Sequence, residues 1–82
     1  MDFRITAEEE ALVFRLAELV DGATQPLETQ LVEELGPDIR QQLDGLKTKG
    51  WILAREAADG MMVVGLTGPA WQAVRSRRDV GR

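Results

Sequence analysis

The segment Lys47–Thr67, KTKGWILAREAADGMMVVGLT, decides the fold of this chain. It leaves a helical pattern at Gly50 and then contains two extended runs rich in Val, Ile and Trp, Trp51–Ala58 and Met61–Leu66. The dipeptide Asp59-Gly60 separates the runs, and it favours a two-residue turn because both turn positions need a positive φ. The sequence therefore predicts a β-hairpin joined directly to the end of a helix.

The hairpin is expected to cover a helical core with its apolar side chains. A turn at Asp59-Gly60 pairs Leu53 with Leu66. The same register pairs Ile52 with Thr67, which places Ile52 and Leu66 on opposite faces unless a bulge intervenes. The side chains expected to cover the core are Trp51, Ile52, Leu53, Val64 and Leu66.

Two short amphipathic helices precede the hairpin and are separated only by Gly36-Pro37. The earlier one, Pro26–Gly36, starts with a proline suited to a first helical turn, and the later one, Asp38–Lys49, ends with lysines that suit the helix dipole. A sharp turn between two helices whose apolar faces meet one core is the helix-turn-helix arrangement. The apolar positions are Leu27, Leu31, Val32 and Leu35 in the earlier helix, and Ile39, Leu43 and Leu46 in the later one.

A longer helix is predicted before this pair, and a final helix after the hairpin. Thr6 can cap the first helix, and Glu9, three residues later, can close a capping box. Thr67 is expected to cap the final helix, in which Trp71 and Val74 face the core. The apolar stripe of the first helix consists of Leu12, Val13, Leu16, Leu19 and Val20.

The order helix, helix-turn-helix, two-stranded hairpin, helix resembles the winged-helix fold. LDGLKTKGWI (residues 43–52) is similar to the end of a recognition helix entering the first wing strand, and VVGLTGPAW (residues 63–71) resembles the second wing strand and following helix of small MarR-type and PadR-type regulators. The resemblance extends from about Thr6 to Arg78. It implies an α+β winged helix-turn-helix with a three-helix core, a hairpin wing and a C-terminal helix, and it implies DNA binding through the third helix.

Composition bounds the function classes. The chain has 82 residues and no cysteine, histidine or tyrosine, so most nucleophiles and neutral-pH proton carriers are missing, and we expect no enzyme, no cofactor and no metal site. No apolar run reaches the ~20 residues of a membrane helix, and the start is acidic where a secretory leader would be basic. We expect one cytoplasmic domain over residues 1–78 and a frayed C-terminal tail over residues 79–82.

Charge divides the chain into two halves. Residues 1–36 carry two basic and nine acidic side chains, a net charge of −7, whereas residues 37–82 carry eight basic and five acidic ones, a net charge of +3. The basic half contains the predicted third helix and the wing. It also contains a basic cluster that offers either phosphate contacts or helix-end charge: Arg75, Arg77, Arg78 and Arg82.

The third helix and the wing supply candidate residues for binding double-stranded DNA. Asp44 lies four residues after Arg40 and is expected to pair with it or repel phosphate. Glu56 and Asp59 cancel the charge of Arg55 at the wing. The candidates are Arg40, Gln41 and Gln42 for base edges in the major groove, and Lys47, Lys49 and Arg55 for phosphates.

The acidic half supports a second hypothesis, a winged helix that binds protein as an adaptor or an inhibitor. A strongly negative surface suits a basic protein partner or the chain's own basic half. Phe14 lies about 140° from the centre of the first helix's apolar stripe, so it is either exposed or a contact to a second molecule, such as a homodimer through this helix. The candidate residues are Glu8, Glu9, Glu10 and Phe14, with Glu33 and Glu34 adding to the negative charge.

Overall fold

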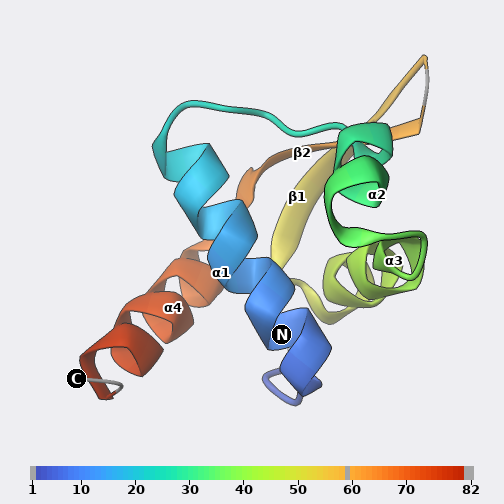
Figure 1. Ribbon diagram of the computed structural model, residues 1–82. Helices are drawn as coiled ribbons and strands as arrows, with labels where there is room; N and C mark the ends of the chain where they lie inside the picture. The colour runs from blue at the N-terminus through green and yellow to red at the C-terminus, as the bar shows by residue number, and fades with distance from the viewer. Residues whose placement is uncertain (1, 59, 81–82) are drawn as a thin grey trace.

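The described residues form four helices and one two-stranded antiparallel hairpin, an α+β arrangement as predicted (Figure 1). The computed structural model describes the backbone of residues 2–58 and 60–80 and, within these ranges, the side chains up to residue 77. The elements are α1 (Ala7–Asp21), α2 (Glu28–Leu35), α3 (Ile39–Lys49), β1 (Ile52–Ala57), β2 (Gly60–Leu66) and α4 (Gly68–Val80). This order and pairing are compatible with a winged-helix layout. Two residues assigned to the tail, 79 and 80, lie within α4, and 81–82 lie outside the described residues.

The helix ends follow the capping signals of the sequence. The Thr6 hydroxyl accepts a hydrogen bond from the Glu9 N–H, and the Glu9 carboxylate accepts one from the Thr6 N–H, which confirms the capping box of α1. Gly50 ends α3 in the left-handed conformation, at φ 82°. Thr67 caps α4 by accepting from the Ala70 N–H at 3.3 Å, and its hydroxyl donates to the Gly50 carbonyl oxygen at 2.7 Å.

The hairpin has a different register from the predicted one. Ala57 pairs with Gly60, so Gly60 belongs to β2 and not to the turn, and Asp59 lies outside the described residues. A β-bulge lies opposite Leu53/Ala54 and adds one residue to β2. The bulge pairs Ile52 with Leu66, and both side chains are buried on the core side of the sheet.

Because of this register, two of the residues expected to cover the core do not do so. Leu53 is 50% exposed, and Val64 is only half-buried, whereas Val63 is fully buried in their place. β2 also forms a short bridge with the segment before α2, because Met62 pairs with Leu27 and the Val63 N–H donates to the Pro26 carbonyl oxygen at 2.9 Å. The segment between α1 and α2 is thereby held against the hairpin.

Helix α1 lies in the middle of the molecule, with α2 and α3 on one side and α4 on the other (Figure 1). It contacts α3, α4 and β2, so it is covered on more sides than a single apolar stripe allows. For this reason Phe14, expected to be exposed or to contact a second molecule, is half-buried and packs against the core. Leu35 differs from its prediction in the opposite sense. The apolar stripe of α2 places it in the core, but it is 45% exposed at the end of that helix.

Trp51 is the largest fully buried side chain, and it joins α3, α4 and the N-terminal segment. Its indole N–H donates to the Asp2 carbonyl oxygen at 2.7 Å, and its ring meets the edge of Phe3 with centroids 6.1 Å apart. The guanidinium of Arg77 on α4 lies 5.4 Å from the ring centroid. The rest of the buried core is Leu12, Val13, Leu16, Ala17, Leu31, Ile39, Leu43, Leu46, Ile52, Val63, Leu66, Ala70 and Val74.

Replacing Trp51 by alanine is expected to lower the free energy of unfolding by about 3–5 kcal/mol, the usual range for a buried large aromatic. The substitution also removes the indole hydrogen bond to Asp2. Urea denaturation followed by circular dichroism measures the effect. Trp71→Ala is the control, because Trp71 is only half-buried on α4 and should cost clearly less. Equal losses for both variants would contradict the central position of Trp51.

Candidate functional site

Five residues of α3 are exposed, and they provide two bases and one acid: Arg40, Gln41, Asp44, Lys47 and Thr48. Arg40 is exposed, but its Nε donates to Glu28 Oε1 on α2 at 2.9 Å. Glu28 also accepts from the Met61 N–H at 3.4 Å, so it ties α3 and the hairpin to the start of α2. Of the residues expected to read bases, Gln41 is exposed, Gln42 is half-buried, and Arg40 is engaged within the fold.

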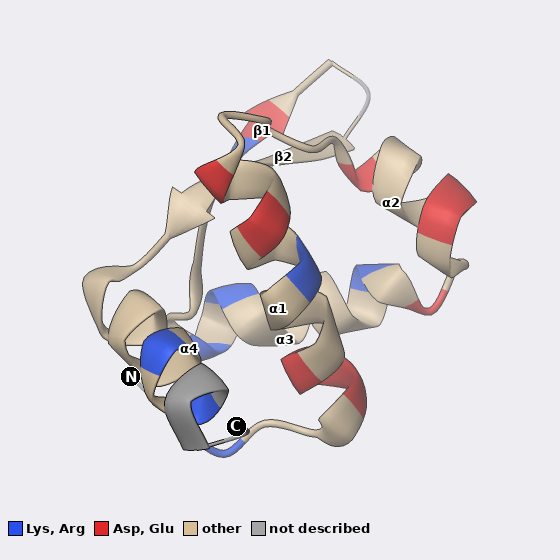
Figure 2. Ribbon diagram, turned by 60° about the vertical axis from the view of Figure 1, so that its left-hand side comes forward, with Lys and Arg blue, Asp and Glu red and all other residues tan. Residues whose placement is uncertain are grey.

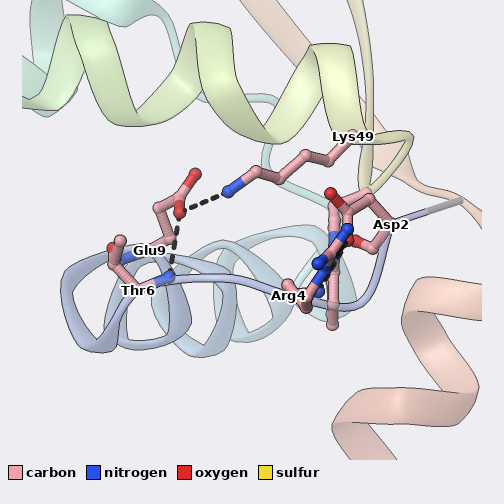
Figure 3. Close-up of polar contacts among 6 residues, drawn as sticks. Asp2, Arg4, Thr6, Glu9 and Lys49 are labelled. Atoms are coloured by element: carbon pink, nitrogen blue, oxygen red, sulfur yellow. Dashed lines mark hydrogen bonds and ion pairs between the residues drawn. The ribbon is translucent and has the colours of Figure 1, made fainter.

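Glu9 and Lys49 form a largely buried ion pair between α1 and α3 (Figure 3). Glu9 Oε1 accepts from Lys49 Nζ at 2.8 Å and from the Thr6 N–H at 2.9 Å, and only 8% of the Glu9 side chain is exposed. The prediction that Glu9 belongs to an exposed acidic face is therefore wrong, because its carboxylate caps α1 and holds α3. Lys49, a candidate phosphate contact, donates to Glu9 in this ion pair.

The environment of Glu9 pulls its pKa in two directions. Burial raises the pKa of Glu9. The hydrogen bonds from Lys49 and from the Thr6 N–H, together with the charge of Lys49, lower it by more than burial raises it, so the pKa lies below its ordinary value. The ionised form of Glu9 is thus the one that stabilises the fold.

Gly45 explains how α3 comes close enough to α1 for this pair. A Cβ at position 45 would lie 2.7 Å from Glu9 Oε2, inside van der Waals contact. Glycine in the interior of a helix costs about 1 kcal/mol relative to alanine. Glycine fits at position 45 because the Glu9 carboxylate occupies the space that a side chain there would fill.

Two more ion pairs connect helices that are distant in the sequence. Arg77 on α4 pairs with Glu10 on α1, so Glu10 is also engaged within the fold. Arg15 Nε donates to Glu34 Oε1 at 2.8 Å and thereby joins α1 to α2, and this hydrogen bond raises the pKa of the guanidinium. Figure 2 shows the arrangement, with acidic segments mainly on α1 and α2 and basic segments on α3 and α4. Three ion pairs join the acidic half of the chain to the basic half, Glu9–Lys49, Glu10–Arg77 and Glu28–Arg40.

The wing is mixed in charge. Arg55 and Glu56 are both exposed on β1. Lys47 is exposed and lines a hollow of ≈ 300 Å³ between α3 and the hairpin, together with the carboxylates of Glu28 and Glu56. A phosphate approaching Lys47 would therefore also approach two carboxylates.

A second hollow, which we call the helix groove, lies between α1, α2 and the start of α3. It has a volume of ≈ 300 Å³. Leu35 borders it and is one of three large apolar side chains exposed among the described residues, the others being Phe3 and Leu53. This surface is not evident from the sequence, because Leu35 continues the apolar stripe of α2. The feature of the sequence that could have indicated its exposure is the position of Leu35 directly before Gly36, where α2 ends. The groove is lined by Glu8, Ala11, Leu12, Arg15, Leu35, Ile39 and Gln42.

Other kinds of site are not seen in the part of the chain that the structure describes. Within it, no group of three or more acidic side chains is placed to hold a metal ion. None of its helices combines the length and apolar character needed to cross a membrane. Comparison of the chain with protein-family models, with curated proteins and with solved structures gives no match.

Glu9→Gln is expected to lower the free energy of unfolding at pH 7 by about 1–2 kcal/mol, because it weakens a charge-assisted hydrogen bond and a helix cap. A carboxylate with a lowered native pKa stabilises the fold above its unfolded pKa, and this stabilisation is lost as the pH falls through the native value. The difference between wild type and Glu9→Gln should therefore shrink below about pH 4.5, the ordinary value for glutamate.

Urea denaturation between pH 3 and pH 7 measures this difference at each pH. Glu8→Gln is the matched control, since Glu8 is exposed in the same helical turn and should change stability by less than about 0.5 kcal/mol. The same pH dependence for both variants would show that the Glu9–Lys49 pair contributes nothing.

Proposed function

We propose that this chain is a winged-helix module that binds another protein. The winged-helix assignment is supported by the order of elements, by the short turn at Gly36 between α2 and α3, and by the hairpin that follows α3. The bridge between Leu27 and Met62 adds a third extended segment to that hairpin, and Thr67 links the end of α3 to the start of α4.

The observation that carries the proposal is that two of the cations expected to contact DNA are paired within the fold. Arg40 is held by Glu28, and Lys49 is held by Glu9. Phosphate contacts supply most of the affinity of DNA-binding proteins, and each depends on an available positive charge. Breaking the Lys49 pair would also leave the largely buried Glu9 carboxylate without its partner, which is costly. The face of α3 that would enter a major groove is thus poorly suited to do so.

The remaining surface suits a protein partner. Leu35 and Ala11 expose aliphatic area in the same groove, and a contiguous apolar patch with a polar rim is typical of interaction sites. Glu8 and Glu33 are exposed on α1 and α2, so they replace Glu9 and Glu10 as the acids available to a partner. Phe14 is half-buried against the core, so the proposal does not use it as a dimer contact.

DNA binding through α3 is the second candidate. Gln41 and Lys47 are exposed on α3, and Arg55 is exposed on the neighbouring β1 strand. Among these, Gln41 offers the amide that reads adenine, and the two cations offer phosphate contacts. This candidate requires that Lys47 and Arg55 outweigh the carboxylates of Glu28 and Glu56 close to Lys47.

Two measurements separate the candidates. Titration with random-sequence duplex DNA at low salt is expected to show no saturable binding, although nonspecific affinity is then strongest. Saturable binding that Lys47→Ala weakens, with a salt slope lower by about one, would favour the DNA reader.

A photo-crosslinking amino acid at position 35 is expected to give a discrete, DNase-resistant adduct with one protein in an extract of the source cells. The same amino acid at position 53 is the matched control, because Leu53 is equally exposed but lies on the wing. The purified partner should then bind Leu35→Lys at least tenfold more weakly than Leu53→Lys. Absence of an adduct from position 35, or equal adducts from both positions, would contradict the proposed function.

A further inference from the structure

We infer that the helix groove receives the apolar side of a cationic amphipathic helix of a partner protein. This inference rests on the proposed function and specifies the chemistry of the partner. Three features of the groove support this inference: its apolar floor, the charge around its rim, and the helices that form its walls.

The floor of the groove is aliphatic. Leu12 and Ile39 are almost fully buried and close the groove from below, and Ala11 is exposed on the wall formed by α1. Leu35 on the α2 wall is 45% exposed. At ≈ 300 Å³ the groove is at the lower end of small-molecule pockets, ~300–1,000 Å³. It can accept a small number of aliphatic side chains.

The rim of the groove is negative once its ion pairs are counted. Arg15 is the basic residue of the lining, and two carboxylates contact it, Glu34 at 2.8 Å and Glu18 at 3.4 Å. Glu8, the acid of the lining, is exposed. Together with the two ion-pair partners of Arg15, the groove therefore carries three carboxylates and one guanidinium, and the complementary partner carries lysine or arginine beside its apolar side chains.

The walls of the groove favour a helical occupant. They are formed by α1, α2 and the start of α3. Helices keep their backbone hydrogen bonds to themselves, so these walls offer no strand edge for a partner to extend. An amphipathic helix instead places side chains at i and i+4 into such a groove and leaves its polar face in water. Gln42, half-buried at the α3 wall, can orient the partner through its amide.

The test uses a synthetic peptide of about 18 residues, long enough to be partly helical in water. It is alanine-rich, with leucine at i, i+4 and i+7 and lysine on both sides of that stripe. Its binding to the full chain is followed by backbone amide chemical shifts. Shifts are expected at Ala11, Leu12, Leu35, Ile39 and Gln42. A peptide with glutamate in place of every lysine should bind at least tenfold more weakly.

Matched variants locate the site. Leu35→Lys should weaken binding of the lysine peptide at least tenfold, and Leu53→Lys, equally exposed on the wing, should leave it unchanged. Glu8→Lys is a second, exposed variant that should also weaken binding, and it keeps the test decisive if Leu35→Lys does not fold. Equal effects of the Leu35 and Leu53 changes, or shifts elsewhere on the molecule, would overturn the inference.

Other occupants give different results. If the chain self-associates at the concentrations used, and the groove residues shift without peptide, the groove belongs to a second copy and the inference is overturned. If the lysine peptide does not bind while the position-35 adduct still forms, the partner chemistry is wrong but the protein-binding function stands. If the adduct is also absent, the proposed function itself fails.

Discussion

The burial of Trp51 is the constraint on which the rest of the structure depends. Its backbone N–H donates to the Leu46 carbonyl oxygen at 2.9 Å, and its own carbonyl oxygen accepts from the Thr67 N–H at 3.1 Å. Its ring lies against Phe3 and beneath Arg77. One residue therefore fixes where α3 ends, where α4 begins and where the N-terminal segment lies. In a domain this small, where burial is limited by size, such a single contact has a large share of the stability.

Electrostatics then decides which surfaces remain available. Residues 1–36 are strongly acidic and residues 37–82 are basic. From the sequence alone, the basic half is expected to bind DNA and the acidic half a basic protein. In the fold, Arg40, Lys49 and Arg77 from the basic half pair with carboxylates from the acidic half. These contacts stabilise the packing of helices, and they also remove charge from the faces that the sequence offered for binding. Lys47 and Arg55 remain exposed close to carboxylates, and the helix groove offers aliphatic area with a modest negative rim.

Local signals in the sequence predicted most of the fold. The capping box at Thr6, the glycine stop at Gly50 and the hairpin depend on neighbouring residues only, so they could be read without the structure. The bulge opposite Leu53/Ala54 could not, because it depends on which face of the hairpin meets the core.

The candidate site was harder to predict, because its properties depend on packing. The burial of Glu9 results from Lys49, forty positions away in the sequence. The exposure of Leu35 and the partial burial of Phe14 depend on which helices cover α1 and α2. Side-chain periodicity predicts one buried face for each helix, but it cannot show how many neighbours a helix has. Helix α1, in the middle of the fold, contacts α3, α4 and β2 and is joined to α2 by the Arg15–Glu34 ion pair.

The glycine at position 45 carries a consequence for how this sequence can vary. Its missing side chain and the Glu9 carboxylate fill one volume, so the two positions are not independent. Alanine at position 45 would displace the end of the Glu9 side chain and thereby disturb its hydrogen bond with Lys49. Related sequences are therefore expected to change positions 9, 45 and 49 together, as a covarying triplet that joins the first turn of α1 to α3.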